Sequence, residues 1–145
     1  AERIVAACGG DANGKVIGVL GVTFKPNTDD MRDAPSLEIL PALRKAGAKV
    51  QAYDPAGMGE AKALLADIDW KENAYDAAQG ADVLLILTEW NEFRALQLDR
   101  LAKLMKTPAI VDLRNVYNPA DAAQAGFAYS SIGRAPVAPQ QERSR

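Results

Sequence analysis

The sequence predicts an α/β fold, a three-layer sandwich in which helices cover both faces of a mostly parallel sheet of five to six strands. Two observations carry this prediction. Short apolar segments typical of buried strands alternate with segments of helical periodicity along the whole chain. That alternation indicates βαβ units, which build parallel sheets. The length of 145 residues is that of one domain.

The expected strands are short, and two of them are especially clear. KVIGVLGV is rich in β-branched residues, and DVLLILT contains the most apolar run of the chain. The full set comprises residues 15–22, 49–54, a short segment around 69–73, 82–88, 109–115 and 127–132. Helices are expected over residues 35–48, 55–68, 74–81, 93–105 and 119–126. Pro35 suits the first turn of helix 35–48, with Ser36 as a competing cap.

The two ends of the chain differ in character from its middle. Residues 1–8 resemble the last turns of a helix, which Gly9 and Gly10 then end, because glycine is favoured just past a helix terminus. A chain that opens in this way is expected to continue a longer protein. Residues 133–145 are rich in Pro, Gln and Arg, so a disordered tail is expected there.

Composition excludes several classes of function. Because 17 Lys and Arg face 19 Asp and Glu, no general affinity for nucleic acid or membranes is predicted. No apolar run of the sequence approaches the ~20 residues that span a bilayer. The single cysteine, Cys8, favours a reducing, cytoplasmic compartment. The absence of histidine excludes Ser-His and Cys-His nucleophile pairs and most zinc sites, so no metal is expected.

Ligands of parallel α/β sheets bind outside the carboxyl ends of the strands. In this sequence those ends carry GVTFKPNTDDMR, YDPAGM, TEWNEF and DLRNVYNP, which are therefore candidate rim segments. The first belongs to a connection, residues 21–36, that is far longer than the about 2–6 residues usual between a strand and a helix. The length and the charges of this connection need an explanation.

The glycine fingerprint of dinucleotide-binding folds, G-x-G-x-x-G, is absent after the first strand, where Gly18 and Gly21 stand alone. A phosphate could instead be met by Lys25 and by the helix N-terminus near Ser36. The fold is therefore predicted to be Rossmann-like, with a first loop that is not built to cradle a dinucleotide.

Two interpretations stay open for several residues of the rim. Lys25 is either a solvated loop residue or a ligand contact, and Phe24 either packs in the core or forms a platform for a base or ribose. Arg114 suits forked binding of a phosphate or carboxylate, or an ion pair with Asp112 or another rim acid. Asp54 either binds a ribose or forms a turn.

The other polar residues of the rim favour structural roles. Asp29 and Asp30 are paired carboxylates that could ligate a metal, but Asp30 and Arg32 more simply shape the loop through hydrogen bonds and an ion pair. Glu89 and Trp90 follow a strand end, where Trp90 is expected to pack the loop.

Three segments, GVTFKPNTDDMRDAPS, TEW and IVDLRN, together closely resemble the C-terminal UDP-binding domain of UDP-glucose 6-dehydrogenases, in the UDP-glucose/GDP-mannose dehydrogenase family. The resemblance extends from ERIVAACGG to YSSIGR, and the loop motif F-K-x-x-T-D-D-x-R is its most specific part. The ending DMRDAPS is more similar to the UDP-glucose branch than to the GDP-mannose branch.

The resemblance implies an NAD-dependent oxidoreductase of nucleotide-sugar metabolism and polysaccharide biosynthesis, which converts UDP-glucose to UDP-glucuronate in two oxidation steps. An N-terminal domain would bind most of the NAD, and the catalytic cysteine would lie in a part of the enzyme outside this chain, in a motif that Cys8 does not match. This chain alone is therefore expected to be inactive and to contain no catalytic residue. Residues 1–10 would end a central helix, residues 11–132 would form the UDP-sugar-binding domain, and residues 133–145 the tail. The full-length enzyme is expected to be a homo-oligomer.

The resemblance also assigns site residues, position by position. Phe24 and Lys25 match residues that contact the UDP-sugar, and Arg114 matches an arginine that contacts the substrate of its own or the partner subunit. Arg32 matches an arginine that reaches NAD, and Asp30 matches a position with a structural role.

Other functions stay open beside this one. The chain could be a GDP-mannose dehydrogenase-type domain or a stand-alone nucleotide-binding module that uses the same rim. A purely structural role, with the N-terminal helix as an association surface, is the remaining alternative.

Overall fold

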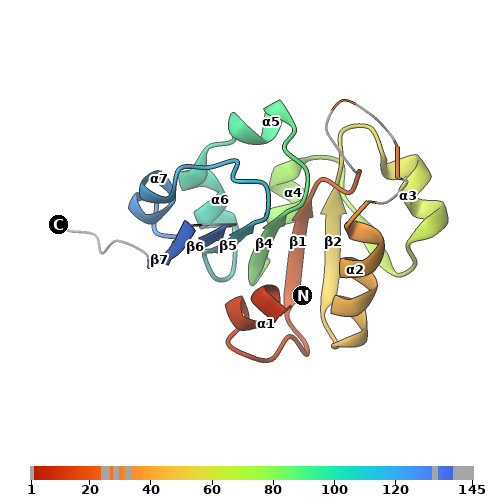
Figure 1. Cartoon of the computed structure of the whole chain (residues 1–145), viewed down its shortest axis with the longest axis horizontal. Coiled ribbons are helices and arrows are strands. Elements are labelled where there is room, and N and C mark those ends of the chain that lie inside the picture. The colour runs from red at the N-terminus through yellow and green to blue at the C-terminus, as the bar shows by residue number, and fades with distance from the viewer. Residues whose placement is uncertain (1, 24–26, 28–29, 32–33, 132–133, 139–145) are drawn as a thin grey trace.

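The computed structural model of the chain describes residues 2–23, 27, 30–31, 34–131 and 134–138. Within these residues seven strands form one sheet in the order β3-β2-β1-β4-β5-β6-β7 (Figure 1). They are β1 (Val16–Leu20), β2 (Lys49–Tyr53), β3 (Ile68–Trp70), β4 (Val83–Ile86), β5 (Ala109–Asp112), β6 (Ala128–Ser131) and β7 (Arg134–Val137). The first six pair in parallel, and β7 pairs antiparallel with β6. The predicted α/β class with a mostly parallel sheet is therefore confirmed.

The helices alternate with the parallel strands, as the sequence predicts. They are α1 (Glu2–Ala7), α2 (Ser36–Lys45), α3 (Met58–Leu64), α4 (Ala74–Ala78), α5 (Asn91–Arg94), α6 (Leu98–Leu104) and α7 (Pro119–Gln124). No helix within the described ranges is both long enough and apolar enough to cross a membrane.

The expected helix over residues 93–105 is in fact two helices, α5 and α6. Other parts of the chain satisfy backbone groups at the break. The Tyr117 hydroxyl donates to the Phe93 carbonyl at 2.5 Å, and the Gln97 N–H donates to the Tyr75 hydroxyl at 3.0 Å. These hydrogen bonds come from residues distant in sequence, so helical periodicity alone does not reveal the break.

The tail expected to be disordered from residue 133 contains a strand. β7 covers Arg134–Val137 and pairs with β6, so that part of the expectation is wrong. An antiparallel neighbour needs only a short turn, and its pairing occupies the backbone groups of β6 that would otherwise form an open edge. Pro136 within the strand and the polar residues that follow it are typical of a tail, so the sequence alone does not reveal this strand.

Two apolar clusters lie on the two faces of the sheet. Alternate side chains of each central strand point to opposite faces, so Leu85 joins one cluster while Leu84 and Ile86 join the other. The first cluster includes residues of α1, α2 and α3. The second includes residues of α4, α5, α6 and α7. The sheet is thus the middle of three layers (Figure 1).

Gly18 in β1 shows how closely these layers pack. A Cβ atom at this position would collide with the backbone carbonyl of Ala77 in α4. The glycine therefore lets the backbone of α4 approach β1, an interior strand of the sheet.

We expect Gly18→Ala to lower the free energy of unfolding by about 1–3 kcal/mol, because the added methyl group overpacks the contact with α4. Urea titration of both proteins measures this loss. Gly59→Ala is the matched control, since a Cβ there meets nothing within 4 Å. It should leave the stability of α3 unchanged or raise it by up to about 1 kcal/mol. Equal effects of the two substitutions would contradict the close packing of α4 on β1.

Candidate functional site

The four predicted rim segments lie at one edge of the sheet. They follow the carboxyl ends of β1, β2, β4 and β5, which are parallel neighbours in the order β2-β1-β4-β5 (Figure 1). The strand order reverses between β1 and β4, because β1 is followed in sequence by β2 on one side and later by β4 on the other. The crevice at such a reversal is where open α/β sheets bind ligands.

Asp54, at the end of β2, is fully buried and holds the start of the long loop. Its Oδ2 accepts hydrogen bonds from the backbone N–H groups of Val22 at 2.8 Å and Thr23 at 3.2 Å. Its Oδ1 accepts from Ala56 at 2.9 Å and Gly57 at 2.7 Å. Of its two interpretations, the turn-forming one is therefore correct, because the carboxylate is buried and bonded to backbone.

This arrangement also bears on dinucleotide binding. In a dinucleotide-binding fold, backbone N–H groups of the first loop point to the pyrophosphate. Here the N–H groups of Val22 and Thr23 point to Asp54 instead. The first loop of this chain therefore does not fit the pyrophosphate of NAD in the usual way, which agrees with the absence of the glycine fingerprint.

Further contacts hold the backbone of Val22 and Thr23, which follow β1. The Thr88 hydroxyl donates to the Thr23 carbonyl at 2.7 Å, and the Ser36 hydroxyl donates to the Val22 carbonyl at 2.6 Å. Ser36 thus bonds across the loop, where the sequence suggested a helix cap. Gly21 has a φ of +88°, and a Cβ there would lie 2.6 Å from the Cβ of Thr88. Glycine is therefore required where the loop leaves β1.

Phe24, Lys25 and Arg32, three of the predicted site residues, lie outside the described residues. Phe24 and Lys25 directly follow Thr23, whose backbone is held as described above. Asp30 is half-buried, and the next residue, Met31, packs in the first apolar cluster. Met31 anchors the far part of the loop, a role that the sequence did not indicate.

Arg114, the fourth predicted site residue, lies at the rim as expected. Its Nε donates to the carbonyl of Leu87 at 2.9 Å, so the side chain reaches from the end of β5 to the end of β4. The same Nε lies 4.0 Å from Oε1 of Glu89. Asp112 accepts a hydrogen bond from the Arg114 backbone N–H at 3.1 Å. The Arg114 side chain, 29 % exposed, therefore lies at the rim, beside the strand reversal.

A second buried carboxylate, that of Asp112, holds the segment that carries Arg114. It is fully buried, and its Oδ2 accepts from the Tyr117 backbone N–H at 3.0 Å and from the Tyr129 hydroxyl at 2.6 Å. Burial, and then the charge of Asp112, raises the pKa of the Tyr117 phenol well above its usual value. Sequence reasoning missed both tyrosines, although each lies at or just beyond a strand.

Tyr53 and Glu92 brace the rim from β2 to α5. The Tyr53 hydroxyl donates to Glu92 Oε2 at 3.0 Å, and its ring meets the Phe93 ring edge-on with centroids 6.3 Å apart. Burial, followed by the hydrogen bond and charge of Glu92, raises the pKa of Tyr53 to about 12. Trp90, buried in the second apolar cluster, packs this segment as its sequence position suggests.

The Cys8 thiol and the acidic side chains are the other groups that could carry chemistry. Burial raises the pKa of the Cys8 thiol, which disfavours the thiolate that a nucleophile requires. Among the described residues, no group of three or more Cys, Asp or Glu side chains is arranged to hold a metal ion.

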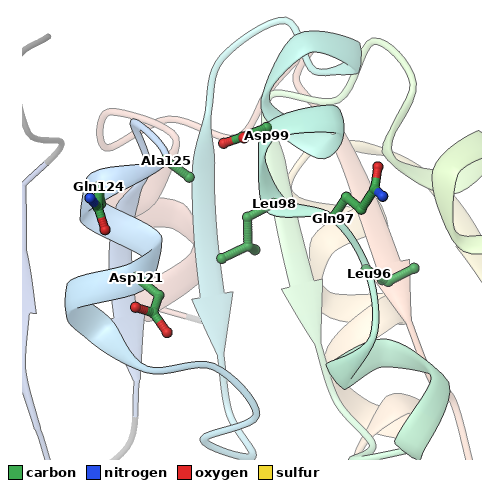
Figure 2. Close-up of a pocket in the computed structure, with 7 residues that line it drawn as sticks. All are labelled: Leu96, Gln97, Leu98, Asp99, Asp121, Gln124 and Ala125. Atoms are coloured by element: carbon green, nitrogen blue, oxygen red, sulfur yellow. The ribbon is translucent and has the colours of Figure 1, made fainter.

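An open groove lies apart from the rim, between α6 and α7 (Figure 2). Its lining residues are Leu96, Gln97, Leu98, Asp99, Asp121, Gln124 and Ala125. None of these side chains is cationic, and two are carboxylates. The groove is therefore unsuited to a diphosphate, whereas the rim carries Arg114.

Comparison with known proteins decides the family. Residues 18–119 match the UDP binding domain of the UDP-glucose/GDP-mannose dehydrogenase family. The chain belongs to this family. The matched range runs from β1 to the start of α7 and contains the four predicted site residues.

Curated relatives of the family are much longer than this chain. UDP-glucose 6-dehydrogenase of Rhizobium meliloti (strain 1021) is 55 % identical over 133 residues, which are 92 % of this chain and 30 % of that protein. UDP-glucose 6-dehydrogenase TuaD of Bacillus subtilis (strain 168) is 43 % identical over 129 residues, 88 % of this chain and 28 % of that protein. The chain thus spans about 30 % of the length of these relatives.

Solved structures of similar proteins share the fold. NDP-N-acetyl-D-galactosaminuronic acid dehydrogenase from Methanosarcina mazei Go1 aligns with a TM-score of 0.79 at 29 % identity, over 90 % of this chain and 28 % of its own. A UDP-glucose dehydrogenase from Pyrobaculum islandicum aligns with a TM-score of 0.76 at 27 % identity, over 92 % of this chain and 28 % of its own.

The Asp112 network makes a testable prediction about the rim. Tyr129→Phe removes a hydroxyl that donates to a fully buried carboxylate. We expect the free energy of unfolding to fall by about 1–3 kcal/mol, as measured by urea titration. Tyr75→Phe is the matched control, because the Tyr75 hydroxyl bonds the Gln97 N–H at an exposed position. A loss at Tyr129 no larger than that at Tyr75 would show that Asp112 does not depend on this hydroxyl.

Proposed function

We propose that this chain is the UDP-sugar-binding domain of an NAD-dependent UDP-glucose 6-dehydrogenase, an enzyme that oxidises UDP-glucose to UDP-glucuronate in two steps. The observation that carries the proposal is Arg114, held by Leu87 at the strand reversal of a domain that belongs to the UDP-binding family. The names of the curated relatives support the UDP-glucose branch over the GDP-mannose branch.

The proposed contacts divide between the two sides of the crevice. Phe24 and Lys25 from the β1 loop and Arg114 from the β5 end contact the UDP-sugar. The pyrophosphate then receives charge-assisted hydrogen bonds from cations on both sides. The guanidinium of Arg114 is suited to this task, because the hydrogen bond from its Nε to the Leu87 carbonyl fixes the plane of the guanidinium group.

The oxidation itself is assigned to other parts of a longer protein. NAD is bound mainly by an N-terminal domain, and Arg32 reaches it from the β1 loop. Binding the nucleotide at a distance from the reacting carbon positions the sugar for that chemistry. The complete enzyme is proposed to be a cytoplasmic homo-oligomer, in which this domain contributes binding and no catalytic residue.

Calorimetric titration of the chain tests the proposed ligand. We expect UDP and UDP-glucose to bind, and GDP and NAD to bind at least tenfold more weakly, about 1.4 kcal/mol in free energy. Preference for GDP would favour a GDP-mannose dehydrogenase-type domain. Preference for NAD over UDP would contradict the proposal and favour a different nucleotide-binding module.

Arg114→Ala tests the residue that carries the proposal. Loss of hydrogen bonds to a charged group should weaken UDP binding by about 1–3 kcal/mol, measured by the same titration. Arg100→Ala, which removes an exposed guanidinium of α6 that stacks on Tyr75 of α4, is the control and should leave UDP binding unchanged. Arg114→Lys retains the charge and loses the fork, so it should recover only part of the affinity. Equal UDP affinity of the Arg114→Ala variant and the unaltered chain would remove Arg114 from the site.

A further inference from the structure

Glu89 lies at the rim where the segments that follow β1, β4 and β5 meet. It follows Thr88, whose hydroxyl donates to the Thr23 carbonyl of the β1 loop at 2.7 Å. From the β5 side, the Nε of Arg114 lies 4.0 Å from its Oε1. Glu89 therefore stands beside the strand reversal between β1 and β4, next to the cation proposed to bind phosphate.

The carboxylate of Glu89 is incompletely satisfied. Its Oε1 is buried and accepts no hydrogen bond in the described part of the chain. The Arg114 Nε–H donates to Leu87 instead, and 4.0 Å is beyond hydrogen-bond distance. A buried acceptor without a donor is costly, and the partly exposed side chain can rotate to turn its carboxylate to the open rim, where a ligand can supply the donor.

Asp54 and Asp112, the acids at neighbouring strand ends, differ from Glu89 in their hydrogen bonds. Both oxygens of Asp54 accept backbone N–H groups, and so do both oxygens of Asp112. These two residues are fully buried, whereas the side chain of Glu89 is 32 % exposed and borders the open rim. The chain thus satisfies its structural carboxylates and leaves an oxygen of Glu89 without a donor.

The chemistry of the site selects the group that Glu89 meets. A phosphate oxygen beside a carboxylate is repelled, so the matching group is a neutral donor. In a UDP-sugar the donors nearest the phosphates are the hydroxyls of the ribose and of the hexose, which flank the diphosphate on its two sides. Arg114 lies next to Glu89. A sugar hydroxyl close to a phosphate bound by Arg114 is therefore also close to Glu89.

We propose that Glu89 is a ligand-binding residue whose carboxylate accepts a hydrogen bond from a sugar hydroxyl of the nucleotide sugar, beside the Arg114 guanidinium. The proposal rests on the function proposed above. It assigns to the TEW segment a specificity role, because a carboxylate acceptor at this place selects a hydroxylated sugar next to the phosphates.

Glu89→Gln tests this role, since it removes the charge and keeps the shape of the side chain. The matched control is Glu92→Gln, which makes the same change on α5 at a carboxylate that already accepts from Tyr53. Each protein is titrated with UDP, 2′,3′-dideoxy-UDP and UDP-glucose, and circular dichroism checks that both variants fold. If a ribose hydroxyl is the donor, Glu89→Gln should weaken UDP about tenfold and the dideoxy analogue less than about twofold.

The remaining outcomes are also decisive. If UDP is unaffected and UDP-glucose alone is weakened, the donor is a hexose hydroxyl and the proposal stands. If Glu89→Gln changes none of the three affinities, or weakens all three equally, the proposal is wrong, because Glu89 then acts only through Arg114 or through the fold. Failure of the unaltered chain to bind UDP would instead overturn the proposed function.

Discussion

The interaction on which the rim depends is the buried carboxylate of Asp54. A charged group that is fully removed from water is tolerated only when hydrogen bonds replace its hydration, and here four backbone N–H groups do so. Two of these donors belong to the β1 loop and two to the turn after β2. The bonds therefore tie the ends of two neighbouring strands together and set the direction in which the long loop leaves the sheet.

This choice has a consequence for ligand binding. Because the N–H groups of Val22 and Thr23 serve Asp54, they are not directed to a ligand phosphate, and side chains of the rim must supply the cations. Asp112 acts in the same way on the other side of the crevice, where it holds the backbone of the segment that presents Arg114. Two buried acids thus build the frame, and the exposed parts of the rim are left for recognition.

A domain built in this way suits the proposed function, in which it holds a nucleotide while another domain performs the reaction. Under that proposal, binding energy from the diphosphate and its flanking sugars is realised at a distance from the reacting atoms and positions the substrate. The groove between α6 and α7 is lined by two carboxylates and no cation, so it does not match an anionic ligand and has no part in this proposal (Figure 2).

The sequence by itself determined the layers, a mostly parallel sheet of five to six strands and the edge at which a ligand is expected, because alternating apolar segments and strand ends are local patterns. It also placed Arg114 at that edge. Only the tertiary structure distinguished Asp54, Glu89 and Asp112, three acids at or beside strand ends that look alike in sequence. Their burial and their partners depend on residues far away along the chain, such as Val22 for Asp54 and Tyr129 for Asp112. The same reason explains why β7 and the division between α5 and α6 were not predicted: each depends on hydrogen bonds with segments that local periodicity does not register.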